Sequence, residues 1–240
     1  MRTVIWGANG AMGQLLQKAL GQEVWGLVSL DGEKGVARNA RELPDVKPEA
    51  VIDFSHHSSV AEVTAYAVSQ GCPLVIGTTG HTEEEQALIY AAAEKIPVFY
   101  SHNMSLGIAV LCRIAKEAAA CFPEADIEIL EIHHNRKVDA PSGTAHMLFK
   151  ALQEVRPEAV KVCGRAGEGK RQKKEIGIAS LRMGNVVGVH EVHICTPSQT
   201  LTLRHEAANR GMFADGAVEA ARFLQGKAPG LYTMQDFLER

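Results

Sequence analysis

The chain has 240 residues, 46% of them hydrophobic and 22% charged, with a formal net charge of -3. These ordinary globular values exclude disordered, collagen-like and disulfide-scaffold proteins, and they give no bulk attraction to nucleic acid or to an anionic membrane. The length favours one large domain or two small ones. No apolar run approaches the roughly 20 residues of a membrane span, and a strand-like run starts at the N-terminus, so we expect a cytoplasmic protein.

Strand-like and helix-like stretches alternate through the first hundred residues. The apolar runs are nearly continuous, which is typical of strands buried on both faces of a parallel sheet. The third expected helix begins with Thr82, followed three residues later by Glu85, which predicts a capping box. We therefore expect a doubly wound α/β fold of the Rossmann type. The expected strands cover residues 3–6, 24–28, 51–54, 73–76 and 97–100, and the expected helices cover 12–20, 60–69 and 82–94.

The pattern changes after about Ser105, where strands that alternate polar and apolar residues begin. Gly184-Asn185 predicts a tight hairpin between two of these strands, which favours a mostly antiparallel or mixed sheet. No strand is expected after the last helix, which could pack back onto the first half. The expected helices cover residues 108–121, 142–154 and 214–224, and the expected strands cover 127–132, 176–183, 186–194 and 200–205. The second half therefore reads as a smaller α+β mixed-sheet domain.

A glycine-rich turn, from Gly7 to Gly13, joins the first strand to the first helix. Its Gly-x-x-Gly-x-x-Gly spacing is a variant of the dinucleotide fingerprint, in which glycines let backbone amides reach a pyrophosphate. A glycine turn without a ligand is the alternative. An acid about 20 residues further on holds the adenosine ribose in such folds, and Asp31 is the nearby candidate, unless it is a solvated turn residue. Nearby Lys34 could tolerate a 2′-phosphate, so we expect both NADH and NADPH to support turnover.

Two further segments, Gly77 to Gly80 and Ser101 to Ser105, directly follow expected strands. The carboxyl ends of parallel strands are where this architecture binds its ligands. Glycine and small hydroxyl residues there would let a nicotinamide ribose approach the backbone. Ordinary strand-ending turns are the alternative for each segment.

The densest cluster of reactive side chains runs from Glu131 to Ala145. It joins an alternating strand to a helix that opens at Ser142 or Gly143, and such a helix start is a ready anion site. Two histidines, an arginine and a lysine add proton donors and positive charge. Strand alternation turns His133 and His134 in opposite directions, so they are not expected to do the same work. A polar loop with chance histidines is the alternative.

Two other patterns are interpreted as structural. His190-Glu191-Val192-His193 lies in an alternating run, which places its histidines on opposite faces of a strand, so we interpret them as sheet residues. The five cysteines form no Cys-x-x-Cys pair, and we expect neither disulfides nor a metal. The basic run from Lys170 to Lys174 is expected to be a solvated loop instead of a nucleic-acid patch.

Taken together, these segments resemble the 4-hydroxy-tetrahydrodipicolinate reductase family, also called dihydrodipicolinate reductases, of the bacterial diaminopimelate–lysine pathway. The resemblance covers nearly the whole chain and is most specific over the block from Glu131 to Ala145. It implies reduction of a small cyclic dicarboxylate by NADH or NADPH, without a metal, nucleic acid or membrane, in a homotetramer. It is carried by residues 7–13, 51–55, 77–80, 101–107, 131–145, 177–184 and 187–192.

The resemblance also implies roles for individual residues. His133 and Lys137 would handle protons, whereas His134, Gly143 and Thr144 would bind the substrate. The residues expected to contact the dinucleotide are Gly7, Ala8, Asn9, Gly10, Ala11, Met12, Gly77, Thr78, Thr79, Ser101, His102, Asn103 and Met104.

The expected domains follow from the change of pattern and from the resemblance. A dinucleotide-binding domain would cover residues 1–105, and a substrate-binding and oligomerisation domain would cover residues 106–212. Residues 213–240 would form a C-terminal helix that returns to the first domain.

Two other functions stay open from the sequence alone. An NAD(P)-dependent amino-acid or sugar dehydrogenase of the same two-domain layout would not need paired histidines before a Lys-x-Asp-Ala-Pro-Ser-Gly-Thr run. A dinucleotide-binding redox sensor without turnover would need the first half only, and it gives no reason for the histidine–lysine cluster.

Overall fold

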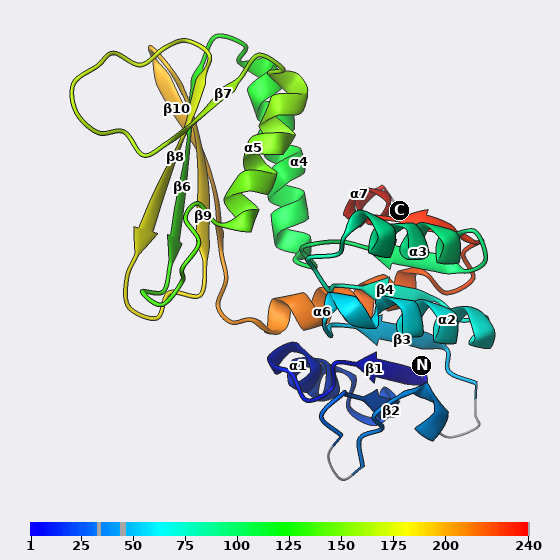
Figure 1. The fold of residues 1–240 in the computed structure, drawn as a ribbon. Coiled ribbons are helices and arrows are strands. Elements are labelled where there is room, and N and C mark those ends of the chain that lie inside the picture. The colour runs from blue at the N-terminus through cyan, green and yellow to red at the C-terminus, as the bar shows by residue number, and fades with distance from the viewer. Residues whose placement is uncertain (33–34, 44–46, 240) are drawn as a thin grey trace. The chain divides into compact units, whose positions relative to one another are not determined.

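The computed structural model describes residues 1–32, 35–43 and 47–239, and it divides the chain into two compact units. Unit 1 comprises Met1–Ser105 and Arg210–Arg240, and unit 2 comprises Leu106–Asn209 (Figure 1). Lys34 lies outside the described residues. Among the described residues, no helix has the length and apolar character needed to cross a membrane.

Unit 1 is built on a six-stranded sheet in which every pair of neighbouring strands is parallel, in the order β11-β5-β4-β3-β1-β2. The predicted doubly wound fold is therefore confirmed. The strands are β1 (Thr3–Trp6), β2 (Val24–Val28), β3 (Ala50–Asp53), β4 (Leu74–Ile76), β5 (Pro97–Tyr100) and β11 (Gly230–Tyr232). The helices are α1 (Ala11–Leu20), η1 (Gly21–Glu23), η2 (Ala40–Glu42), η3 (His57–Ser59), α2 (Val60–Gln70), α3 (Glu83–Ala93), α6 (Gly211–Phe223) and α7 (Met234–Leu238).

Successive strand residues are buried on opposite faces of this sheet. Val98 of β5 belongs to a core that includes Ile89 of α3, whereas the ring of the next residue, Phe99, contacts the rings of Phe223 and Phe237. Burial on both faces explains why the strands read as nearly continuous apolar runs. The predicted capping box is present at the start of α3.

The expectation that no strand follows the last long helix is wrong. After α6 the chain forms β11, which pairs in parallel with β5 at the edge of the unit 1 sheet. Its three residues, Gly230, Leu231 and Tyr232, are too few to show a periodic pattern, and only the partner strand stabilises them as a strand.

Unit 2 contains a five-stranded mixed sheet in the order β10-β9-β6-β8-β7, as Figure 1 shows with two helices along it. The predicted mixed sheet is confirmed. The strands are β6 (Asp126–His133), β7 (Val160–Cys163), β8 (Glu175–Arg182), β9 (Val189–Thr196) and β10 (Gln199–Glu206), and the helices are α4 (Leu106–Cys121) and α5 (Gly143–Val155). Residues of both helices pack on Ile127, Ile129, Ile178 and Val192 in one core.

The predicted hairpin at Gly184-Asn185 is wrong. β8 and β9 do not pair with each other, because β6 lies between them, parallel to β8 and antiparallel to β9. Gly184 has the positive φ of a turn residue, and its carbonyl accepts a hydrogen bond from the Asn135 amide of the β6–α5 loop. Gly184-Asn185 therefore does form a turn, as predicted. The strands on either side of it pair with β6, which is distant in sequence, and not with each other. The hairpin of this sheet joins β9 to β10.

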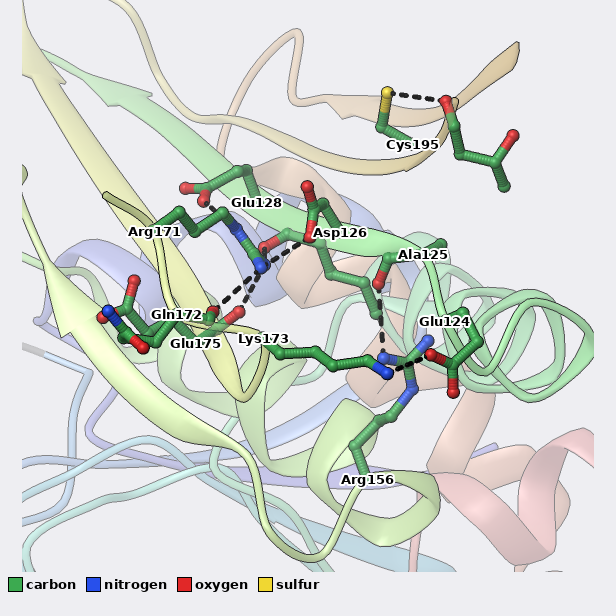
Figure 2. A network of polar contacts seen from close by, with 12 residues as sticks. Glu124, Ala125, Asp126, Glu128, Arg156, Arg171, Gln172, Lys173, Glu175 and Cys195 are labelled. Atoms are coloured by element: carbon green, nitrogen blue, oxygen red, sulfur yellow. Dashed lines mark hydrogen bonds and ion pairs between the residues drawn. The ribbon is translucent and has the colours of Figure 1, made fainter. Parts of the chain in front are cut away.

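The basic run 170–174 is only partly a solvated loop. Figure 2 shows the Arg171 guanidinium pointing at the start of β6, where it pairs with Asp126 at 2.6 Å and Glu128 at 3.4 Å. It also donates to the carbonyls of Ile127 and Glu175. Arg171 thus fastens the β7–β8 loop to the sheet, whereas Lys173 in the same run is exposed.

Candidate functional site

Three loops of unit 1 surround a cavity at the carboxyl ends of β1, β2 and β3. The cavity volume is about 230 Å³, and the predicted turn residues Gly7 and Gly10 line it together with Asp31, the expected ribose-binding acid. The sequence analysis assigned no ligand-binding role to the other lining residues. These are Trp6, Ser29, Leu30, Phe54, Ser55, His56 and Ser59. Their signal was available, because Trp6 ends β1 and the others follow β2 and β3, the two strands that pair in parallel with β1.

The glycines of the first turn are required by close backbone approach. Gly7 has φ +83°, and a Cβ there would lie 2.3 Å from the Phe54 carbonyl oxygen. A Cβ at Gly13 would lie 2.2 Å from the Gly7 carbonyl oxygen. The turn therefore packs tightly against both the β3 loop and its own helix, as the dinucleotide fold requires.

The start of α1 is suited to an anionic ligand. Gly10 is its N-cap and supplies no side-chain cap, so the first helical amides of Ala11 and Met12 have no such partner. Ala8 is buried, and its amide donates to the Val28 carbonyl, whereas the buried Nδ2 atom of Asn9 has no partner among the described residues. Open amides and an unpaired donor beside the cavity fit a dinucleotide pyrophosphate.

The segment after β4 is tied to the cavity wall. Gly77 packs against the Phe54 ring, where a Cβ would lie 2.3 Å from a ring carbon. The Ser55 amide donates to Thr78 Oγ1 at 2.9 Å, whereas Thr79 is exposed. The loops after β3 and β4 therefore form one connected edge of the sheet.

Asp53, the last residue of β3, holds this edge together. It is 1% exposed, and its carboxylate accepts hydrogen bonds from the Ser55 amide at 3.1 Å and the Ser55 hydroxyl at 2.5 Å. Burial raises the pKa of Asp53 from 3.8 to about 6, even though hydrogen bonds from Ser55 and Thr78 lower it.

The segment after β5 is held by its own side chains. Ser101 Oγ donates to the Asn103 carbonyl at 2.8 Å, and Asn103 Oδ1 accepts from the Ser105 amide at 2.9 Å. Met104 is buried, and His102 is exposed. This segment does not line the cavity, but its Ser101 amide donates to the last carbonyl of β4, so it continues the same edge.

In unit 2 the cluster predicted around Glu131 converges at the end of β6. Glu131 and His133 lie two residues apart and face the helix side of the sheet, where they are 0% and 9% exposed. Glu131 Oε2 and His133 Nδ1 are 2.5 Å apart. β6 ends at His133, so His134 is the first residue of the following loop.

Arg182, on the neighbouring strand β8, completes the arrangement around Glu131. Its two terminal nitrogens donate to the two carboxylate oxygens at 2.9 and 2.8 Å. Burial opposes ionisation of Glu131, but hydrogen bonds from Arg182, Ser180 and His133 lower its pKa to about 2. The carboxylate is therefore ionised at any neutral pH.

A second histidine, His190 on β9, lies against His133 with the ring centroids 5.1 Å apart. Ser142 Oγ accepts from the Ala145 amide, so its hydroxyl is free to donate to His190 Nε2 at 3.2 Å. Burial, together with the nearby His133, lowers the pKa of His190 to about 4, so this ring is neutral at pH 7. His193 faces elsewhere and contacts Thr202 of β10, which confirms that both histidines are sheet residues.

The loop after β6 carries the predicted lysine. Lys137 Nζ pairs with Asp139 Oδ1 at 2.8 Å, and this lysine lowers the pKa of Asp139. Arg182 donates to the Asp139 carbonyl, which fixes the loop beside the Glu131 site. Lys137 and His133 are both close enough to act electrostatically on His190.

The loop ends at the first turn of α5. Ser142 is the N-cap and is 2% exposed, whereas the following Gly143 is exposed and Thr144 is partly exposed. An accessible first turn next to buried Ser142 presents backbone amides to an anion. The structure thus brings His133, Lys137 and the α5 start together within unit 2.

The fold and these sites together define a class of protein. A doubly wound sheet with a glycine-rich first turn, carried by the same chain as a mixed-sheet unit with a buried carboxylate–histidine pair, is the layout of a two-domain, dinucleotide-dependent oxidoreductase.

The chain belongs to the dihydrodipicolinate reductase family. The family's N-terminal model matches residues 1–104, and its C-terminal model matches residues 107–238. The 4-hydroxy-tetrahydrodipicolinate reductase of Alkaliphilus metalliredigens is 41% identical over 99% of both chains. The corresponding protein of Akkermansia muciniphila is 43% identical over 98% of this chain and 96% of its own. The expected NAD(P)H-dependent oxidoreductase is therefore confirmed.

Solved structures agree with this assignment. A dipicolinate-bound dihydrodipicolinate reductase from a Paenisporosarcina species has a TM-score of 0.81 and 26% identity over 99% of both chains. An aspartate dehydrogenase from Thermotoga maritima has a TM-score of 0.51 and 16% identity over 95% of this chain and 98% of its own. The second likeness shows a shared fold only, so the dehydrogenase alternative is not favoured.

Changing Asp53 to Asn should alter the pH dependence of unfolding. Because the folded pKa of Asp53 lies above its unfolded value, the protonated acid stabilises the fold below about pH 4, and this contribution is lost as pH rises through about 6. Asn keeps an acceptor for Ser55 and does not titrate. Relative to the variant, the wild type should lose about 2.5 kcal/mol of unfolding free energy between about pH 4 and pH 7.5.

Urea unfolding of both proteins at the two pH values measures this difference. Asp215→Asn, on an exposed position of α6, controls for the general effect of removing a carboxylate. If the difference in unfolding free energy between the wild type and Asp53→Asn is the same at both pH values, Asp53 does not titrate as proposed.

Proposed function

We propose that this chain reduces 4-hydroxy-tetrahydrodipicolinate to tetrahydrodipicolinate with NADH or NADPH, in the cytoplasmic route to diaminopimelate and L-lysine. The observation that carries the proposal is the buried Glu131–His133 pair beside the accessible start of α5. This arrangement supplies a proton-handling group and an anion site within unit 2. The family match over both units supports the same reaction.

The dinucleotide would be held at the strand ends of unit 1. The first turn would receive the pyrophosphate at the start of α1, and the segments after β4 and β5 would contact the nicotinamide ribose. The cofactor supplies the hydride, and the chain binds and orients it. The residues assigned to this role are Gly7, Ala8, Asn9, Gly10, Ala11, Met12, Gly77, Thr78, Thr79, Ser101, His102, Asn103 and Met104.

The substrate would bind at the end of β6 and the start of α5. A cyclic dicarboxylate needs donors around each carboxylate, and the amides of Gly143 and Thr144, the Thr144 hydroxyl and His134 would supply them. The Paenisporosarcina enzyme with a similar fold binds dipicolinate, which is also a ring with two carboxylates. Hydride addition to the ring leaves electron density that must be protonated, and His133 with Lys137 would handle that proton.

Substitutions should separate these roles in steady-state kinetics. His133→Ala or Lys137→Ala removes a group that acts in the transition state, so kcat should fall by roughly 100-fold or more. His134→Ala or Thr144→Ala removes a contact made in both ground and transition states, so KM should rise instead. The measurement is the fall of NADH absorbance with freshly generated substrate.

The controls for these variants are His193→Ala and Lys170→Ala, which remove the same side-chain types outside the proposed site. Cofactor dissociation constants should stay near wild type in all four site variants, since none of these residues belongs to unit 1. A near-normal kcat in His133→Ala with a collapsed kcat in His134→Ala would reverse the assignment of the two histidines.

The cavity of unit 1 favours the use of both cofactors. Asp31 lines it and suits ribose hydroxyls, but its charge disfavours a 2′-phosphate. Next to it, the Arg38 side chain packs on Gly32, where a Cβ would lie 2.4 Å from Arg38 Cγ. Gly32 directly follows Asp31, so a carboxylate that lines the cavity and a guanidinium meet at the same turn and balance the two preferences.

The ratio of kcat/KM for the two cofactors should therefore stay below roughly 1,000-fold, which corresponds to about 4 kcal/mol. Arg38→Ala should lower kcat/KM for NADPH more than for NADH, because only NADPH carries the 2′-phosphate. Asp31→Asn serves as the opposite control and should favour NADPH. A preference above the limit in the wild type would refute dual use.

The open face of the unit 2 sheet supports assembly as a homotetramer. Strand register places Leu130 and Ile132 of β6 beside Ala179 and Leu181 of β8, all opposite the helix-covered core. Leu181 is 46% exposed, and Met183 just beyond β8 is 53% exposed. Exposed apolar residues grouped on one sheet face are typical of an interface, and a second copy of this chain is its proposed occupant.

Leu181→Glu should dissociate the tetramer into smaller species, because it places a charge on this apolar face. Light scattering coupled to size exclusion measures the mass. Leu88→Glu, at a 41% exposed apolar position on α3, is the matched control and should stay tetrameric. A monomeric wild type, or an intact tetramer in Leu181→Glu, would overturn this assembly.

A further inference from the structure

We infer that Glu131 is a positioning residue that fixes which nitrogen of His133 exchanges the proton and sets the place of the substrate-binding helix start. The inference rests on the proposed function, in which His133 handles the proton. Residues two apart on strand β6 share a face, so Glu131 and His133 point to the same side of the sheet. At 2.5 Å, the Glu131–His133 contact joins an ionised acceptor to the Nδ1 atom.

An ionised carboxylate only accepts hydrogen bonds, so His133 Nδ1 must carry the hydrogen in this contact. In neutral imidazole the other nitrogen, Nε2, is then the free acceptor, and it is the atom that gains and releases the proton. Space at Nε2 is kept by Gly188, where a Cβ would lie 3.2 Å from that atom.

Glu131 keeps this role because its own proton affinity is low. The Arg182 guanidinium donates to both carboxylate oxygens and stabilises their negative charge. Because the pKa of Glu131 is about 2, the carboxylate does not take the proton from His133. It holds the orientation of the His133 ring, in the way that a buried aspartate orients the histidine of a serine protease. Glu131, Lys137 and His205 act electrostatically on His190, whose ring packs against the His133 ring. Arg182 pairs with Glu131, and Asp139 pairs with Lys137.

The other oxygen of Glu131 has a separate task. Oε1 accepts from the amide of Ser142 at 3.1 Å, and Ser142 is the N-cap of α5. One carboxylate therefore sets both the proton-handling ring and the helix start that presents Gly143 and Thr144. Glu131→Gln and Glu131→Asp distinguish these tasks, because Gln removes the charge but keeps an oxygen acceptor for Ser142, whereas Asp keeps the charge on a shorter side chain.

Glu131→Gln is the central variant. Its amide oxygen still accepts from Ser142, so KM should stay within about twofold of wild type. Its NH₂ group faces His133 and forces Nδ1 to become the acceptor, which moves the hydrogen to Nε2. We expect kcat to fall by about 10- to 100-fold. The pH profile of kcat should also move, because the substitution removes the negative charge that lies 2.5 Å from His133 Nδ1.

Glu131→Asp restores the charge and should recover part of kcat and a wild-type pH profile. Glu128→Gln is the matched control, since it makes the same change on the same strand but on the opposite face, where Glu128 pairs with Arg171. It should leave kcat and the pH profile unchanged. If Glu131 only stabilised the fold, Glu131→Gln would lower the free energy of unfolding but would leave the pH profile of kcat unchanged.

Nitrogen NMR of the histidine rings reads the tautomer of His133 without relying on turnover. The wild type should show a neutral ring protonated at Nδ1, and Glu131→Gln should show one protonated at Nε2. A wild-type ring protonated at Nε2 would overturn the inference, as would Glu131→Gln with wild-type kcat and an unmoved pH profile. If the Gln variant does not fold, the wild-type tautomer and the Asp variant decide the question.

The two proposals fail in different ways. A wild-type protein that does not reduce the substrate would refute the proposed function, yet the NMR comparison would still decide whether Glu131 sets the His133 tautomer. Normal wild-type turnover with an Nε2-protonated ring would refute the positioning role only.

Discussion

Burial of the Glu131 carboxylate is the constraint on which the functional end of unit 2 depends. A charge taken out of water is strongly destabilising unless donors replace its hydration. Here the donors come from three elements: His133 on β6, Arg182 on β8 and the Ser142 amide at the start of α5. The parallel register that sets His133 beside Arg182 brings two of them together. His133, Arg182 and the start of α5 are therefore grouped because one anion needs all three.

Unit 1 is organised by backbone proximity instead of by a charge. At Gly7 and Gly77 the loops after β1 and β4 touch the residues that follow β3, and at Gly13 helix α1 touches the first turn. A Cβ at any of the three would overlap a neighbour. Asp53 secures the same edge through Ser55 and Thr78. Tight loop packing leaves open amides at the start of α1, so the anion-binding surface follows from the same glycines that make the fold possible.

Local patterns predicted most of the fold, because burial on both faces of a strand and helix capping leave signals within a few residues. The strands 3–6, 24–28 and 97–100 and the capping box at Thr82 agree with the structure. Pairing between distant strands leaves no local signal, which is why Gly184-Asn185 suggested a hairpin where β6 in fact separates β8 from β9. β11 escaped notice for the same reason, since its three residues are strand only through β5.

In the candidate site, too, residues close along the chain could be predicted from the sequence, whereas their partners from distant strands could not. The sequence placed His133 and Lys137 in one cluster because they are close along the chain, but Arg182 and His190 reach that cluster from β8 and β9. These distant partners decide the chemistry. His190 is buried against Ser142 and is neutral, whereas His133 in the same core faces an ionised carboxylate. Two touching imidazoles thus differ in what they can do with a proton, and the difference lies in their partners and not in the residue type.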